Sequence, residues 1–294
     1  MSLLPLLVVP SHVPPQGPLL RAEHVTIEYA GAQGVVRATD DVSFEVHRGD
    51  RFVLLGPSGC GKSTLLKAVG GFITPRAGSL RLAGRPITAP GPDRIVVFQE
   101  FDQLPPWKTV ESNVMFPLLA GGMKKVEARE RARHWLGKVG LARFADAYPH
   151  TLSGGMKARV AIARALAMQP EILLMDEPFA ALDALTRRTM QEQLQSLWEE
   201  IGFTMLFVTH SIEEALVVGN RILLLSPHPG RVRAELNSHQ FDLKSAGSPE
   251  FQAANERIHR LLFGDMRVGD MRAGDPSHAA PAPQAALPSC AVHS

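Results

Sequence analysis

Residues 56–63 constrain this chain more than any other stretch, because they match the phosphate-binding pattern G-x-x-x-x-G-K-[ST]. The pattern is convincing only between a strand and a helix. Both flanks are present: 51–55 is a short apolar run typical of a strand, and 63–69 favours a helix. The sequence therefore predicts a nucleoside triphosphate site, formed by Gly56, Pro57, Ser58, Gly59, Cys60, Gly61, Lys62, Ser63 and Thr64.

The residue types of this loop suit phosphate chemistry. Glycines let successive backbone N–H groups point at phosphate oxygens, and the helix N-terminus adds its dipole. Lys62 is placed to reach the β- and γ-phosphates, and the Ser63 hydroxyl can ligate Mg²⁺. The alternative is a glycine-rich turn that matches the pattern by accident, and the two flanks disfavour it.

Composition narrows the class of partner. The 294 residues suffice for one large or two small domains. The chain has 31 basic and 29 acidic residues, a net charge of +2, which offers no basic field for nucleic acid. The two cysteines, Cys60 and Cys290, make no disulfide framework. We therefore expect a reducing cytoplasmic compartment and no nucleic-acid partner.

The N-terminal segment is apolar but does not resemble an export signal. No Lys or Arg precedes the apolar run 3–9, and prolines interrupt the segment that follows. No window reaches the 18 or more apolar residues of a membrane span. We predict that 1–19 is a disordered lead-in, and that any work at a membrane is done through a partner.

Apolar runs and helical stretches alternate along the chain. Strands are expected at 20–29, 42–46, 51–55, 78–84, 95–98, 172–175, 205–208 and 221–226, and helices at 63–69, 126–139, 156–168, 185–198 and 212–218. Such alternation predicts an α/β fold with a parallel sheet covered by helices. A helical subdomain is expected at about 101–160, and 246–294 is expected to be a C-terminal helix, within 249–263, followed by a disordered tail.

Two further features downstream suit phosphate chemistry. Asp176 and Glu177 follow the strand 172–175, where an acid beside a phosphate loop can hold Mg²⁺ and a second acid can act on a hydrolytic water. A second glycine turn, with Ser153, Gly154 and Gly155, opens a helix and can also bind phosphate. For the two acids, an ordinary strand-to-turn junction is the alternative.

Taken together, these motifs resemble the ATP-binding subunit of an ABC transporter over about 20–245. In family order they are the Walker A motif (56–64), the Q-loop glutamine Gln99, the LSGGQ-type signature (152–156), the Walker B motif (172–177), the D-loop (181–183) and the switch histidine His210. The resemblance implies a P-loop NTPase fold with a mainly parallel sheet, an antiparallel β part and a helical subdomain.

The resemblance also implies roles for single residues. Lys62, Gln99, Glu177 and His210 would act in ATP hydrolysis, Glu177 by polarising the attacking water. Ser63, Gln99 and Asp176 would surround Mg²⁺. Tyr29 would stack on adenine, with plain strand-end packing as the alternative. Ser153 and Gly155 would contact ATP bound to a second copy, and Gly154 and Asp183 would also bind nucleotide. The sequence departs from the family pattern at Met156, Ala158 and Ala181, none of which is a phosphate ligand.

The resemblance further implies an assembly. It would be a homodimer with two ATPs between the subunits, docked on two integral-membrane permease subunits at the cytoplasmic face of the inner membrane. An external solute-binding protein would deliver the cargo. Docking is expected near Gln99 and 101–107.

The stretches 97–107 and 225–231 resemble importer subunits for nitrate, sulfonates and taurine. The expected function is therefore energising uptake of a small anion, with pyrimidine precursors or another small solute as the alternative. Non-transport ABC ATPases are also weighed. An ABC ATPase of DNA maintenance needs a long coiled-coil insertion between its motifs, and this sequence shows none. A translation-associated ABC protein carries two such cassettes in one chain, whereas this chain has one. An exporter is disfavoured only by the nitrate-like stretches.

Overall fold

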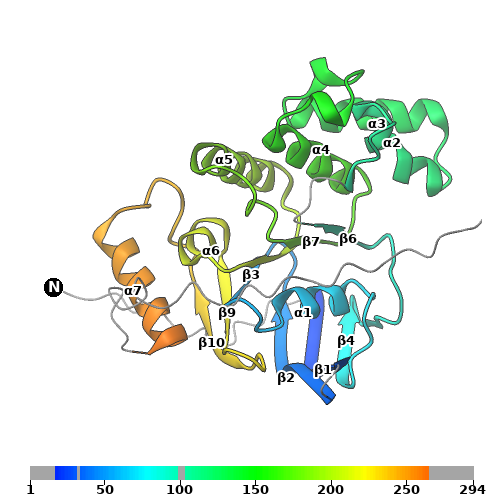
Figure 1. Cartoon of the computed structure of the whole chain (residues 1–294). Coiled ribbons are helices and arrows are strands. Elements are labelled where there is room, and N and C mark those ends of the chain that lie inside the picture. The colour runs from blue at the N-terminus through cyan, green and yellow to red at the C-terminus, as the bar shows by residue number, and fades with distance from the viewer. Residues whose placement is uncertain (1–16, 32–33, 99–102, 265–294) are drawn as a thin grey trace, which may run out of the picture.

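The computed structural model describes residues 17–31, 34–98 and 103–264. Within these ranges the chain forms a six-stranded sheet in the order β10-β9-β3-β8-β7-β6 and a four-stranded sheet in the order β2-β1-β4-β5 (Figure 1). Gln99, most of the predicted lead-in and the predicted tail beyond 264 lie outside the described residues.

The larger sheet is built from continuous apolar runs. Its strands are β3 (Arg51–Leu55), β6 (Arg94–Val97), β7 (Ile172–Asp176), β8 (Met205–Thr209), β9 (Arg221–Leu225) and β10 (Val232–Asn237). Every residue of β3, β7 and β8 is buried, as expected where helices or a second sheet cover both faces. All neighbouring strands are parallel except β9 and β10. The predicted α/β fold with a mainly parallel sheet is confirmed.

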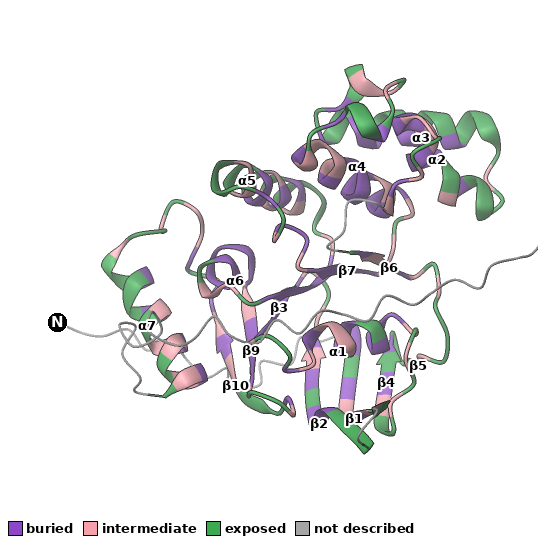
Figure 2. Ribbon diagram, in the orientation of Figure 1, coloured by how far each residue is buried: buried purple, intermediate pink, exposed green. Residues whose placement is uncertain are grey.

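The smaller sheet is antiparallel. It contains β1 (Leu20–Gly31), β2 (Gly34–Val46), β4 (Ala77–Leu82) and β5 (Arg85–Pro86). Buried and exposed residues alternate along the second half of β2, the pattern of a strand with one wet face (Figure 2). Leu19 is already buried, and its carbonyl accepts a hydrogen bond from Ala83, so ordered packing begins just before β1.

Four helices accompany the larger sheet: α1 (Lys62–Val69), α5 (Ala184–Ile201), α6 (Ile212–Val218) and α7 (Pro249–Phe263). Helix α7 matches its predicted range. The Ser248 hydroxyl caps it by accepting from the Phe251 N–H, and its buried residues Phe251, Ile258 and Leu262 share the face that packs on α6 and β10. Among the described helices, none is long and apolar enough to cross a membrane.

The remaining helices, α2 (Val110–Ala120), α3 (Lys125–Lys138) and α4 (Gly154–Ala167), pack on one another and lie together at one end of the molecule (Figure 1). The buried carboxylate of Glu111 joins α2 to α3, since it accepts from Arg129 Nε at 3.0 Å and Arg133 Nε at 2.6 Å. A buried carboxylate is stable only when its oxygens are bonded in this way.

Parallel strands place the loops that follow them at one edge of the sheet. At this edge the phosphate loop follows β3, Glu177 follows β7, His210 follows β8, and the segment 226–231 follows β9. Because β9, β3, β8 and β7 are neighbours in this order, segments far apart in sequence surround the phosphate loop.

Candidate functional site

The phosphate loop between β3 and α1 has the backbone that the glycine pattern predicts. Gly59 and Gly61 have φ of 78° and 91°, in the left-handed region that favours glycine. A Cβ at Gly61 would lie 2.6 Å from the Ala38 carbonyl oxygen, so β2 presses directly on the loop. The fully buried Cys60 side chain fills the space beneath, and burial raises the pKa of its thiol.

Lys62 lies folded under the loop. Its ammonium donates to the carbonyls of Gly56 at 2.8 Å and Pro57 at 2.9 Å, and only 4% of the residue is exposed. A buried cation held by neutral groups, here two carbonyls and more distantly the Cys60 Sγ at 3.9 Å, attracts an anion strongly. We therefore expect Lys62 to turn to the phosphates of a bound nucleotide.

Ser63 and Asp176 meet although 113 positions separate them in sequence. The Ser63 hydroxyl donates to Asp176 Oδ1 at 2.7 Å. Burial raises the pKa of the Asp176 carboxyl above its usual value, and the bond from Ser63 opposes that rise. A hydroxyl and a carboxylate in contact are hard oxygen donors of the kind that Mg²⁺ prefers, so these two residues fit the predicted metal.

Glu177 and His210 are also brought together. His210 Nδ1 lies 2.9 Å from Glu177 Oε2, which links the ends of β8 and β7. Glu177 has a positive φ of 44°, uncommon outside glycine, and its N–H donates to the Val208 carbonyl at 3.0 Å. Strained backbone of this kind clusters at functional sites, because surrounding bonds must hold it in place.

Tyr29 lies in β1, with its hydroxyl 3.1 Å from Thr64 Oγ1 at the start of α1. It lines an open cavity of about 340 Å³ over the phosphate loop, large enough for a nucleotide. The lining residues are Tyr29, Val36, Ala38, Ser58, Gly59, Gly61, Lys62, Ser63, Thr64, Glu177 and His228. Tyr29, the loop and Glu177 thus share one cavity, as their predicted roles require.

The second glycine turn lies elsewhere. Ser153 and Asp183 cap the N-termini of α4 and α5, accepting from the N–H groups of Met156 and Thr186. A Cβ at Gly155 would lie 2.7 Å from Thr186 Cγ2, so these two helix ends touch. The cavity over the phosphate loop is lined by none of the four predicted residues of this region, Ser153, Gly154, Gly155 and Asp183.

The predicted Q-loop residue Gln99 lies outside the described residues, so its contacts are not part of this geometry. Gln103 is anchored, because Arg164 of α4 donates to its carbonyl at 2.8 Å and to its Oε1 at 2.9 Å. This anchor joins the start of the helical region to α4.

Two residues near the site were not predicted from sequence. Glu214 of α6 is buried and accepts hydrogen bonds from Thr209 and Gln191, which fixes the strand end that carries His210. Burial raises the pKa of its carboxyl, and both bonds oppose that rise. His228 lines the nucleotide cavity. The prolines on both sides of His228 mark a turn in the sequence, but no local pattern shows that this turn lies against the phosphate loop.

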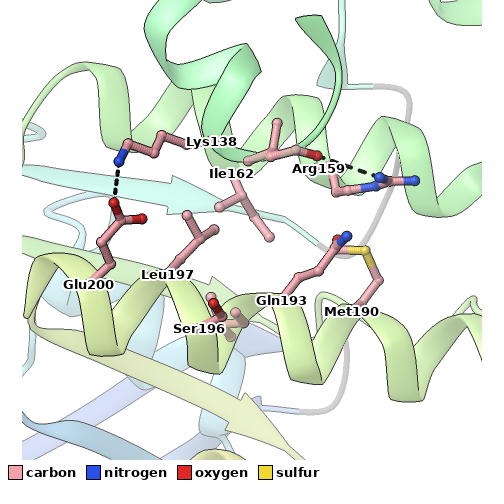
Figure 3. A pocket seen from close by; sticks show the side chains of 10 residues that line it. Lys138, Arg159, Ile162, Met190, Gln193, Ser196, Leu197 and Glu200 are labelled. Atoms are coloured by element: carbon pink, nitrogen blue, oxygen red, sulfur yellow. Dashed lines mark hydrogen bonds and ion pairs between the residues drawn. The ribbon is translucent and has the colours of Figure 1, made fainter.

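A second cavity, of about 90 Å³, lies between α3, α4 and α5 (Figure 3). The Lys138–Glu200 ion pair crosses one end of it, and two buried atoms that line it, Arg159 Nε and Gln193 Oε1, have no hydrogen-bond partner among the described residues. No predicted site residue lines this cavity. The candidate active site is therefore the cavity over the phosphate loop.

Strand β3, the glycine loop and the helix carrying Lys62 and Ser63 are joined by an acid at the end of β7, a parallel strand separated from β3 by β8. This arrangement defines a P-loop nucleoside triphosphatase. Comparison with known proteins is more specific. The family described as ABC transporter matches residues 39–180.

Individual relatives match most of the chain. A taurine import ATP-binding protein of Rhizobium johnstonii is 47% identical, over 83% of this chain and 96% of its own. One from Yersinia pestis is 46% identical, over 79% and 89%. Among solved structures, cbiO1 from Clostridium perfringens, part of the complex cbiONQ, has a TM-score of 0.69 at 28% identity, covering 83% of this chain and 97% of that one.

A dimeric ATP-binding cassette, MJ0796, in a post-hydrolysis state with ADP and Pi, has a TM-score of 0.64 at 34% identity. It covers 76% of this chain and 100% of that one. The chain belongs to the ABC transporter family, and within it to the ATP-binding proteins that hydrolyse ATP.

Proposed function

We propose that this chain is the ATPase subunit of an importer for a small sulfonate of the taurine type. The observation that carries the proposal is the 47% identity with a taurine import ATP-binding protein over nearly the whole of that protein. The ATPase would not itself touch the cargo, so the relatives, rather than the site, support the substrate class.

In the proposed hydrolysis, Lys62 turns from its carbonyl partners to the phosphates, and the other described site residues act from where they lie. Lys62 and the loop N–H groups would bind the phosphates, while Ser63, Asp176 and Gln99 would hold Mg²⁺. When bound, the metal would neutralise negative charge on the phosphates. The Glu177 carboxylate accepts a hydrogen bond from the attacking water. His210, whose Nδ1 lies 2.9 Å from Glu177 Oε2, orients that carboxylate and reaches the γ-phosphate.

We further propose that two copies form a head-to-tail sandwich. Ser153, Gly154, Gly155 and Asp183 do not line the chain's own nucleotide cavity, which favours a role toward a nucleotide on another copy. Helix α4 would then aim its N-terminal N–H groups at that nucleotide's phosphates. ATP would bridge the two surfaces, and hydrolysis would remove the bridge.

Docking to a permease is proposed at the surface around 101–107, on a helical subdomain at about 101–160. Trp107 is 75% exposed. The turn that carries it is held, because the buried Asn113 amide donates to the carbonyls of Pro105, Lys108 and Thr109. Tryptophan is enriched at protein interfaces, so an exposed tryptophan on a held turn suits a partner surface. Such a complex, with two permease subunits and a solute-binding protein outside, would lie at the cytoplasmic face of the inner membrane.

The mechanism is tested with Glu177→Gln. We expect this variant to bind ATP, to lose turnover by about 10²–10⁴-fold, and to accumulate as a dimer with ATP in size-exclusion chromatography, because a general base contributes on this scale. Turnover at the wild-type rate, or a monomer at saturating ATP, would contradict the proposal.

The cargo is tested separately, by uptake of labelled taurine, an alkanesulfonate, nitrate and a pyrimidine precursor into cells with and without the gene for this chain. Loss of sulfonate uptake alone is the expected result. Loss of nitrate or pyrimidine uptake instead would assign the other cargo and overturn the sulfonate proposal, while leaving the ATPase mechanism intact.

A further inference from the structure

The segment 226–231 joins β9 to β10 and lies against the phosphate loop. Strand β9 pairs in parallel with β3, with Leu224 opposite Leu55, so the chain leaves β9 beside the residues that begin the loop. This places the segment on the side of β3 away from β8 and β7, which carry His210 and Glu177.

Close contacts hold the segment there. A Cβ at Gly230 would lie 2.1 Å from the Cys60 carbonyl oxygen, so only glycine allows this approach. The Gly230 N–H donates to Ala38 at 3.0 Å, and its carbonyl accepts from Asp40 at 2.9 Å. The next residue, Arg231, donates from Nε to Asp40 Oδ2 at 2.9 Å. The segment is thus fixed to both the phosphate loop and β2.

The apex of the segment is also restrained. The Ser226 hydroxyl accepts from the Arg231 N–H at 3.0 Å, and its oxygen lies 3.0 Å from the carbonyls of both Pro227 and Pro229. Proline on each side of His228 fixes φ at the neighbouring positions. The backbone that carries the side chain therefore loses little entropy when a ligand binds.

His228 is exposed and lines the nucleotide cavity. Its ring takes part in no hydrogen bond with the described part of the chain. The same cavity is lined by Tyr29, which is tied to Thr64 at the start of α1, and by the glycines of the phosphate loop. A nucleotide with its base on Tyr29 and its phosphates on the loop has its sugar between the two, inside the cavity that His228 also lines.

We propose that His228 hydrogen-bonds a ribose hydroxyl of the bound nucleotide. The inference rests on the proposed placement of the phosphates on the loop and the base on Tyr29. Neutral imidazole carries one donor and one acceptor nitrogen, and a ribose hydroxyl can both accept and donate, so either tautomer can form the bond. This gives the segment 226–231 a role in nucleotide binding rather than in cargo choice.

The test compares ADP, 2′-deoxy-ADP and 3′-deoxy-ADP by calorimetry with the full chain, since diphosphates bind without turnover. The wild type should bind ADP about three- to ten-fold more tightly than the analogue that lacks the contacted hydroxyl, the scale of one neutral hydrogen bond. His228→Ala should bind ADP more weakly by a similar factor, and its affinity for that analogue should be unchanged. His228→Gln, whose amide also donates and accepts, should restore part of the preference.

The controls separate the ways in which the test can fail. His134→Ala, an exposed histidine on α3, should bind all three nucleotides as the wild type does. If His228→Ala binds ADP normally, or weakens ADP and both deoxy forms equally, the ribose contact is overturned. If the wild type binds no ADP at all, the placement of nucleotide on the phosphate loop fails instead.

Discussion

At the scale of single residues, Gly61 shows how tightly the nucleotide site is built. Its φ of 91° is unfavourable for any side chain, and a Cβ would lie 2.6 Å from a backbone oxygen of β2, which cannot move aside as a side-chain tip can. We expect Gly61→Ala to destabilise the protein by about 2–4 kcal/mol, the sum of left-handed strain and displacement of the loop, and to abolish ATP binding.

Gly84→Ala provides the matched comparison for Gly61→Ala. Gly84 has a φ of 76°, but no atom lies within 4 Å of the position that a Cβ would take, so the variant carries the backbone strain without the clash. We expect Gly84→Ala to lower the free energy of unfolding by about 1–2 kcal/mol and to keep ATP binding. Thermal unfolding and nucleotide titration of both variants check the prediction, and equal losses in the two would contradict it.

The residues of the site were predictable from sequence where a local pattern carries the chemistry. Gly59, Gly61, Lys62 and Ser63 form one short motif, and an acid at the end of a buried strand identifies Asp176. His228 was not predictable as a nucleotide contact, because its place depends on β9 lying beside β3. Strand order is a property of the whole sheet, and no spacing within 225–231 encodes it.

At the scale of elements, Glu214 holds α6, α5 and β8 together through a buried carboxyl. It accepts from Thr209 of β8 and from Gln191 of α5 at 3.2 Å. Burial raises the folded-state pKa of this carboxyl above its ordinary value of 4.5, so the folded state binds its proton more tightly than the unfolded state does. The stability from this group therefore falls as the pH rises from the unfolded pKa through the folded pKa.

Removing the charge should reverse that loss. We expect Glu214→Gln to raise stability by about 1 kcal/mol at pH 8, with the gain shrinking as the pH is lowered toward 4.5. The neighbouring Glu213 is exposed, and Glu213→Gln should show no such trend. Urea unfolding of both variants between pH 4.5 and 8 makes the measurement. A gain for Glu214→Gln that is constant with pH would contradict the argument.

The elements differ in how well sequence predicts them. Strands β3, β7 and β8 are continuous apolar runs, so their burial on both faces follows from composition. Strand β10 was not predicted, because most of its residues are at least partly exposed and it carries no clear alternation. Its structure comes from pairing with β9. The exposed first part of β2, from Gly34 to Arg37, was missed for the same reason and is held by β1.

At the scale of the whole molecule, the exposed Trp107 supports contact with a permease. Burying such a side chain contributes roughly 1.5–3 kcal/mol or more, which a partner surface would gain. We expect Trp107→Ser to lower cargo uptake at least ten-fold while ATP turnover of the isolated chain stays unchanged. Ile201→Ser, a change at an exposed apolar residue at the end of α5, should affect neither. Normal uptake by the Trp107 variant would remove this surface from the proposed interface.

The proposed sandwich places the two halves of each ATP site on different chains. The phosphate loop of one copy supplies Lys62, and the end of α4 on the other supplies Gly155, which lies outside its own chain's nucleotide cavity. A chain carrying Lys62→Ala and a chain carrying Gly155→Asp should each be inactive alone. When the two variants are mixed, they can form mixed dimers. In these dimers one site combines the intact phosphate loop of the Gly155→Asp chain with the intact α4 end of the Lys62→Ala chain.

Random pairing of equal amounts makes half of the dimers mixed, each with one of its two sites intact. If the sites act independently, the mixture should therefore regain about a quarter of the wild-type ATP turnover. Differently tagged chains that co-purify in the presence of ATP establish that mixed dimers are present. Mixed dimers without turnover would show that one intact site is insufficient, whereas turnover by the Gly155→Asp chain alone would place the whole site within a single copy and overturn the sandwich.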